Sequence, residues 1–162
     1  MKKTTLMFTL MAFAIAFSIQ VSGQKADFDG SWKLDESKST LPQFPVILVK
    51  IDVTIKGDSL FTERFYDTGD GQIYPFTENL TLDNKEYLIT IYDMPRKAKA
   101  AWSEGGLSLE SSIVINGDSG PDNFISKETW SADSANKTLS INFKNSTSAG
   151  EESGVFFFNK AE

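Results

Sequence analysis

The stretch Ile47–Ile55, ILVKIDVTI, decides the fold of this chain, because apolar β-branched residues occupy every second position along it. Lys50, Asp52 and Thr54 fill the intervening positions of its second half. Side chains of a β-strand alternate between its two faces, so this run predicts a strand with one apolar and one largely solvated face. The sequence KGDS at 56–59 is typical of a turn, and a second strand is expected over Leu60–Tyr66.

The same pattern of short alternating runs and turn residues continues to the end of the chain, and no helical period accompanies it. Longer polar connections are expected at Asp67–Gly71 and at Asn116–Asn123. The remaining strands are expected around Trp32 and over Phe76–Leu82, Tyr87–Ile91, Arg96–Trp102, Leu107–Ile115, Phe124–Trp130, Leu139–Phe143 and Gly154–Phe158.

About ten strands without crossover helices indicate an antiparallel meander. Twist and exposed edges disfavour a flat sheet of that size, so the sheet must close on itself or stack as two layers. We therefore predict an all-β fold, a single antiparallel up-and-down barrel of 8 to 10 strands. A β-sandwich is the alternative.

The first 23 residues have the organisation of a secretory signal peptide. Lys2 and Lys3 precede an apolar run that is too short to anchor in a bilayer, and small residues end the segment at Val21-Ser22-Gly23. We expect cleavage after Gly23, a single domain over residues 24–162, and a periplasmic or extracellular location in a bacterium. No stable membrane insertion is expected after cleavage, and the chain has no cysteine that could carry a lipid anchor.

Charge and composition argue against several classes of function. The chain has 16 basic and 22 acidic residues, and loss of Lys2 and Lys3 takes the net charge to about −8. A surface of that sign repels phosphate backbones, so no nucleic-acid partner is expected. The chain has no histidine and no cysteine, which argues against Ser-His-Asp or Cys-His catalysis and ordinary zinc sites. We expect no metal and no cofactor.

The segment Phe28–Asp35, FDGSWKLD, resembles the opening of the lipocalin-like domains of secreted bacterial proteins, which carry a Gly-x-Trp on the first strand. Here that motif is Gly30 and Trp32, and the segments 59–64 and 127–130 resemble later strands of the same group. The resemblance implies a calycin-type barrel, closed where the tryptophan packs and open at the other end around a cavity for a small apolar molecule. It also implies a basic residue over the tryptophan, for which Lys144 and Lys160 are both candidates.

Arg64 and Glu128 are the polar residues most specifically placed by strand alternation. Arg64 shares its parity with Leu60, and Glu128 shares its parity with Phe124 and Trp130. If those faces point inward, the two charges lie inside the barrel and should pair, because an unpaired buried charge is costly. The opposite phase of the first strand, with Phe61 and Phe65 inward, stays open.

Aromatic residues are abundant, and most of them are expected to fill the β core. Some are expected to line the ligand cavity beside Arg64 and Glu128, since such pockets are mostly apolar with a few polar groups. The candidates are Phe61, Phe65, Tyr66, Tyr87, Trp102 and Trp130.

These patterns favour an exported, non-enzymatic protein that binds a small apolar ligand. The alternative is a structural or protein-interaction module of the cell envelope, with an inhibitory role as one example. Catalysis would have to rely on carboxylates, and Glu63 with Glu128 could be imagined as a glycosidase-like pair. Solvated strand residues or ion-pair partners are the simpler interpretation of both.

Overall fold

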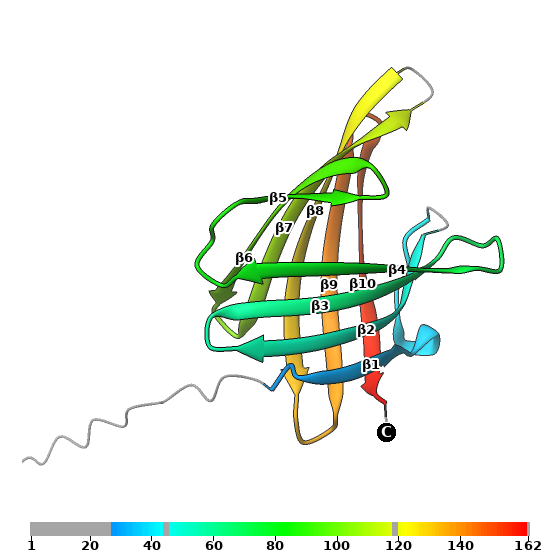
Figure 1. Cartoon of the computed structure of the whole chain (residues 1–162). Helices are drawn as coiled ribbons and strands as arrows, with labels where there is room; N and C mark the ends of the chain where they lie inside the picture. The colour runs from blue at the N-terminus through cyan, green and yellow to red at the C-terminus, as the bar shows by residue number, and fades with distance from the viewer. Residues whose placement is uncertain (1–26, 44–45, 118–119, 162) are drawn as a thin grey trace, which may run out of the picture.

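A computed structural model describes residues 27–43, 46–117 and 120–161, so the expected signal peptide lies outside the described residues. The described part consists of ten strands and one short 3-10 helix (Figure 1). Their bounds are β1 Gly30–Leu34, η1 Glu36–Lys38, β2 Ile47–Lys56, β3 Ser59–Asp67, β4 Ile73–Thr81, β5 Tyr87–Ile91, β6 Met94–Ser103, β7 Gly106–Gly117, β8 Gly120–Asp133, β9 Thr138–Thr147 and β10 Gly150–Lys160. No helix among these residues is long and apolar enough to span a membrane.

All ten strands form one antiparallel sheet in the order β4-β3-β2-β1-β10-β9-β8-β7-β6-β5. Each strand pairs with its neighbour in sequence except β4 and β5, which form the two ends of the sheet. β1 joins the two halves by pairing with both β2 and β10. The sheet curls until β3 and β8, which are far apart in that order, face each other across the interior. The predicted up-and-down barrel is thus confirmed, and the sandwich alternative is not observed.

The barrel is nearly closed, with a seam where the end strands β4 and β5 meet. Side chains join the two edges there: the Thr81 and Tyr87 hydroxyls are hydrogen-bonded at 2.9 Å, and the Tyr92 hydroxyl donates to the carbonyl oxygen of Pro75 at 2.6 Å. The Tyr92 ring also packs edge-on against Tyr74. Side-chain contacts therefore supplement the sparse backbone contact at this seam.

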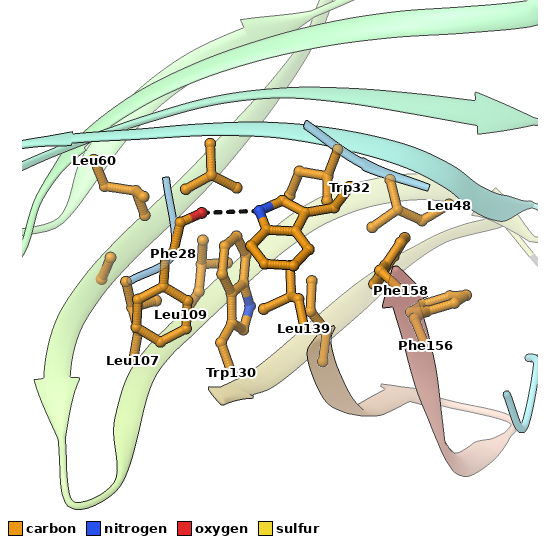
Figure 2. Packing of buried hydrophobic residues seen from close by; sticks show 14 of the residues in the cluster. Phe28, Trp32, Leu48, Leu60, Leu107, Leu109, Trp130, Leu139, Phe156 and Phe158 are labelled. Atoms are coloured by element: carbon orange, nitrogen blue, oxygen red, sulfur yellow. Dashed lines mark hydrogen bonds between the residues drawn. The ribbon is translucent and has the colours of Figure 1, made fainter. Parts of the chain in front are cut away.

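A cluster of buried apolar side chains fills one part of the barrel interior, which we call the closed end (Figure 2). Trp32 and Trp130 are both fully buried, and the indole nitrogen of Trp32 donates to the carbonyl oxygen of Phe28 at 2.8 Å. The Phe28 ring lies 6.4 Å from that of Trp130. Leucines and phenylalanines from β2, β3, β7, β9 and β10 complete this closed end, namely Leu48, Leu60, Leu107, Leu109, Leu139 and Phe158. Burial of this much apolar surface is the main stabilising contribution to such a domain.

A β-bulge in β2 changes which residues of the opening stretch face inward. Leu48 pairs with Tyr66 and Lys50 with Phe65, so Val49 is the extra residue. A bulge places two residues opposite one and reverses the phase of alternation. Leu48 therefore joins Ile51 and Val53 in the core, whereas the uninterrupted alternation predicted Val49 there.

The polar segment Asn116–Asn123 is mostly strand, which corrects the expectation of a loop. Asn116 pairs with Pro121 and Gly117 with Gly120, so β7 and β8 continue as a two-stranded ribbon. Figure 1 shows this ribbon extending well beyond the barrel. Backbone pairing along a hairpin proceeds whatever the polarity of its side chains, so composition alone did not reveal the ribbon.

Candidate functional site

An ion pair between Arg64 of β3 and Glu128 of β8 crosses the barrel interior. The arginine Nη1 and Nη2 donate to the glutamate Oε1 and Oε2 at 2.8 and 2.9 Å, which is the bidentate geometry of a strong charge-assisted pair. The Trp130 indole nitrogen donates to Oε2 at 2.8 Å. The Arg64 side chain is 1% exposed and that of Glu128 is 10% exposed. The predicted pairing is present, and the inward phase of Arg64 is the correct one.

Each member of the pair stabilises the charged form of the other. Burial by itself would lower the pKa of Arg64, but the adjacent Glu128 carboxylate outweighs this effect and the pKa is raised. Burial would likewise raise the pKa of Glu128, but Arg64 and the Trp130 hydrogen bond lower it below its ordinary value of 4.5. Both side chains are therefore charged at neutral pH, and each neutralises the other.

A second interior ion pair joins Arg96 of β6 to Glu78 of β4 through Nη1 and Oε1. Both side chains are at most 9% exposed, and the Arg96 guanidinium lies 5.1 Å from the centre of the Phe76 ring. This pair links β4 to β6 next to the seam. The sequence analysis did not single out either residue, although both share the inward parity of their strands, with Leu80 for Glu78 and Ala98 for Arg96.

Inward-facing side chains change from buried to accessible along the barrel. On β7, Leu107, Leu109 and Ser111 are buried, whereas Ile113 and Ile115 are half-buried. The neighbouring strands show the same gradient beyond the two ion pairs. We call this accessible half the open end; its half-buried inward residues include Tyr66, Phe76, Ile89, Ile113 and Phe124. The open end therefore presents apolar surface above a floor of paired charges.

Four of the predicted lining residues face the interior, at two different levels. Tyr66 lies at the open end, with its hydroxyl 3.4 Å from Nη1 of Arg64. Tyr87 lies opposite the buried Ala98, on the closed side of Arg96, and packs against the core. Trp130 is fully buried in the closed end. Trp102 is half-buried and packs on that core, with its ring 6.1 Å from Phe28. The two tryptophans therefore support the floor of the barrel rather than its accessible half.

Phe61 and Phe65 do not line the interior, and that expectation is wrong. They alternate with Thr62 and Arg64, which are buried inside, so they lie on the outer face of β3. Phe61 is 42% exposed beside a shallow outer hollow, and the ring of Phe65 lies under the Lys50 ammonium group. A period-two pattern alone could not tell whether these phenylalanines face outward or inward.

Glu63 lies in the same outer hollow, on the side of the wall opposite to Glu128. Two carboxylates separated by the barrel wall cannot flank one glycosidic bond, so they do not form a catalytic pair. The residues that the structure describes also contain no cluster of acids, histidines or cysteines suited to a metal ion.

The packing around Trp32 explains why the Gly-x-Trp motif has a glycine at position 30. Lys160 is the basic residue over the Trp32 ring, with its Nζ 5.2 Å from the ring centre, whereas Lys144 pairs with Glu151. A Cβ at Gly30 would lie 2.6 Å from Cε of Lys160, and the φ of Gly30 is +134°, a conformation that other residues rarely adopt. Glycine thus makes room for the lysine that covers the tryptophan.

No protein-family model and no curated protein matches this chain. Among solved structures, it is similar to the zebrafish ileal bile acid-binding protein complexed with cholic acid, with a TM-score of 0.50. The two share 13% sequence identity, and the match covers 83% of this chain and 98% of that one. At this identity the likeness concerns the fold alone, which is an antiparallel β-barrel.

Proposed function

We propose that this protein binds a small apolar molecule in the open end of its barrel, above the Arg64–Glu128 pair. The observation that carries the proposal is the set of inward-facing apolar side chains that remain solvent-accessible there. A ligand that covers them removes apolar surface from water, at about 25 cal/mol for each square ångström. Sites for small molecules are typically concave and apolar with a few polar groups, and the buried ion pairs supply the polar groups here.

The fold neighbour supports the same function, because it is a bile acid-binding protein by name and was solved with cholic acid. In the proposed function the barrel acts as a container and performs no catalysis. We further propose that the chain is exported to the periplasm or the medium of a bacterium, on the strength of the signal-peptide organisation of residues 1–23.

The binding proposal is tested with N-phenyl-1-naphthylamine, an uncharged dye whose fluorescence rises in apolar surroundings. The protein should saturate with this dye at one site. Ile113→Asp, which places a carboxylate among the inward apolar residues, should weaken binding at least about tenfold, the equivalent of about 1.4 kcal/mol. Val114→Asp is the matched control, because Val114 is the next residue of β7 and is 47% exposed on the outer face.

Failure of the wild type to bind the dye, or equal weakening by both variants, would contradict an interior site. Export is tested separately by expressing the full chain in a bacterium. The protein recovered from the periplasm or medium should begin at Gln24, whereas a protein retained in the cytoplasm with residues 1–23 attached would overturn that proposal.

A further inference from the structure

We propose, resting on the binding function above, that the interior site selects neutral ligands over anionic ones such as fatty carboxylates. The structure assigns this selectivity to the Arg64–Glu128 pair, because the carboxylate of Glu128 occupies the position that the acid group of a ligand would need. The inference thus defines the chemical class of ligand for the proposed site.

The first argument is the charge balance of the interior. Arg64 and Arg96 are the cations at the inward-facing positions of β3 to β8 in the part of the chain that the structure describes. Each already contacts a carboxylate, that of Glu128 or Glu78. The lysines of these strands alternate with the inward residues and lie on the outer wall, as with Lys97 and Lys99 of β6, Lys97 exposed and Lys99 half-buried. An anionic ligand would therefore meet no uncompensated positive charge on these strands.

The second argument is the cost of exchanging partners at Arg64. The guanidinium holds both oxygens of Glu128 at 2.8 and 2.9 Å, and the Trp130 indole donates to the same carboxylate. A ligand carboxylate that took this place would leave Glu128 buried with one neutral hydrogen bond and no counter-charge. A buried charge without a partner is strongly unfavourable, so it is unfavourable for a ligand carboxylate to replace Glu128 as the partner of Arg64.

A neutral ligand avoids this exchange. It can cover the apolar residues of the open end while the two ion pairs stay intact beneath it, and it brings no charge that must be desolvated. Removal of the Glu128 charge should shift the preference toward anionic ligands, because it leaves the Arg64 guanidinium free to pair with the acid group of a ligand.

The test measures displacement of N-phenyl-1-naphthylamine by dodecanoate and by its methyl ester at pH 7. The two compounds also differ in hydrophobicity, so the readout is the ratio of their displacement constants and its change between variants. In the wild type the ester should displace the dye at a concentration at least about tenfold lower than dodecanoate. In Glu128→Gln the ratio should shift toward dodecanoate by at least about tenfold.

Two variants isolate the effect of charge. Glu63→Gln removes a carboxylate from the outer face of β3 and should leave the wild-type ratio unchanged. The double replacement Arg64→Gln with Glu128→Gln restores a neutral interior and should return the ratio to the side of the ester. A merely structural role of Glu128 would change dye binding without this reversal and restoration.

Should Glu128→Gln fail to fold, the wild type provides the same test through pH. The carboxyl group of dodecanoate, with a pKa of about 4 to 5 like other carboxylic acids, is almost fully charged at pH 7 and about half neutral at pH 4.5. Displacement by dodecanoate should then strengthen toward that of the ester, while displacement by the ester stays constant. A pH-independent ratio would overturn the inference.

The outcomes separate the two proposals. A wild type that binds no dye overturns the proposed function and this inference with it. A wild type that binds the dye, yet shows an ester-to-dodecanoate ratio near one or a ratio that Glu128→Gln leaves unchanged, overturns the selectivity alone.

Discussion

Replacement of Glu128 by alanine tests whether the interior ion pair supports the fold. The variant leaves the Arg64 guanidinium, which is 1% exposed, without its bidentate partner. Breaking one partner of a buried pair costs about 3 to 5 kcal/mol, a large part of the roughly 5 to 15 kcal/mol that stabilises an ordinary domain. At about 3 to 5 °C for each kcal/mol in a domain of this size, the Tm should fall by roughly 10 to 20 °C.

The assay is thermal unfolding followed by circular dichroism, with Glu63→Ala as the control on the outer face of the wall. The double replacement Arg64→Met with Glu128→Leu strands no charge and should recover much of the loss. Recovery should fall short by about 1 to 3 kcal/mol, because the buried Trp130 indole nitrogen loses the acceptor that it has at 2.8 Å. The reasoning is refuted if Glu128→Ala melts within two degrees of the wild type, as Glu63→Ala should.

Three further predictions concern pH and the closed end. The pKa of Glu128 is lowered in the folded state, so its contribution to the free energy of unfolding is complete above pH 4.5 and is lost as the pH falls through the lowered pKa. Urea titrations at decreasing pH should therefore show a larger loss of stability in the wild type than in the charge-free double variant. Lys160→Ala should lower stability by about 0.5 to 2 kcal/mol through loss of its cation–π contact, whereas an equal loss in Lys144→Ala would contradict that role. Gly106→Ala places a Cβ against the backbone carbonyl of Trp130 and should cost at least about 2 kcal/mol; a wild-type Tm would show that β7 and β8 can separate freely there.

The candidate site was only partly predictable. Strand parity brought Arg64 and Glu128 together as a pair because each shared a face with apolar neighbours. The same rule left the phase of β3 ambiguous, since phenylalanines occupy one face and Leu60 and Arg64 the other. Only the three-dimensional closure, which sets β3 opposite β8, shows that Arg64 is inside and that Phe61 and Phe65 are outside.

Arg96 and Glu78 illustrate a second reason for omission. Their partnership depends on β4 and β6 meeting at the seam, and these strands are not paired with each other in the sheet. No local pattern encodes such a contact. The choice between Lys144 and Lys160 was undecidable for the same reason, because β1 and β10 become neighbours only when the two halves of the sheet join.

By itself, the sequence determined that this chain forms about ten antiparallel strands in an up-and-down barrel with a tryptophan near its start. Those features depend on period-two alternation, turn residues and short connections, which act within a few residues of one another. The tertiary structure alone decided the phase of β3, the bulge in β2, the extended β7–β8 ribbon and the partners of the interior charges. The reason is physical: which face of a strand is buried, and which charges meet, follow from closure of the whole sheet, so they depend on residues far apart in the chain.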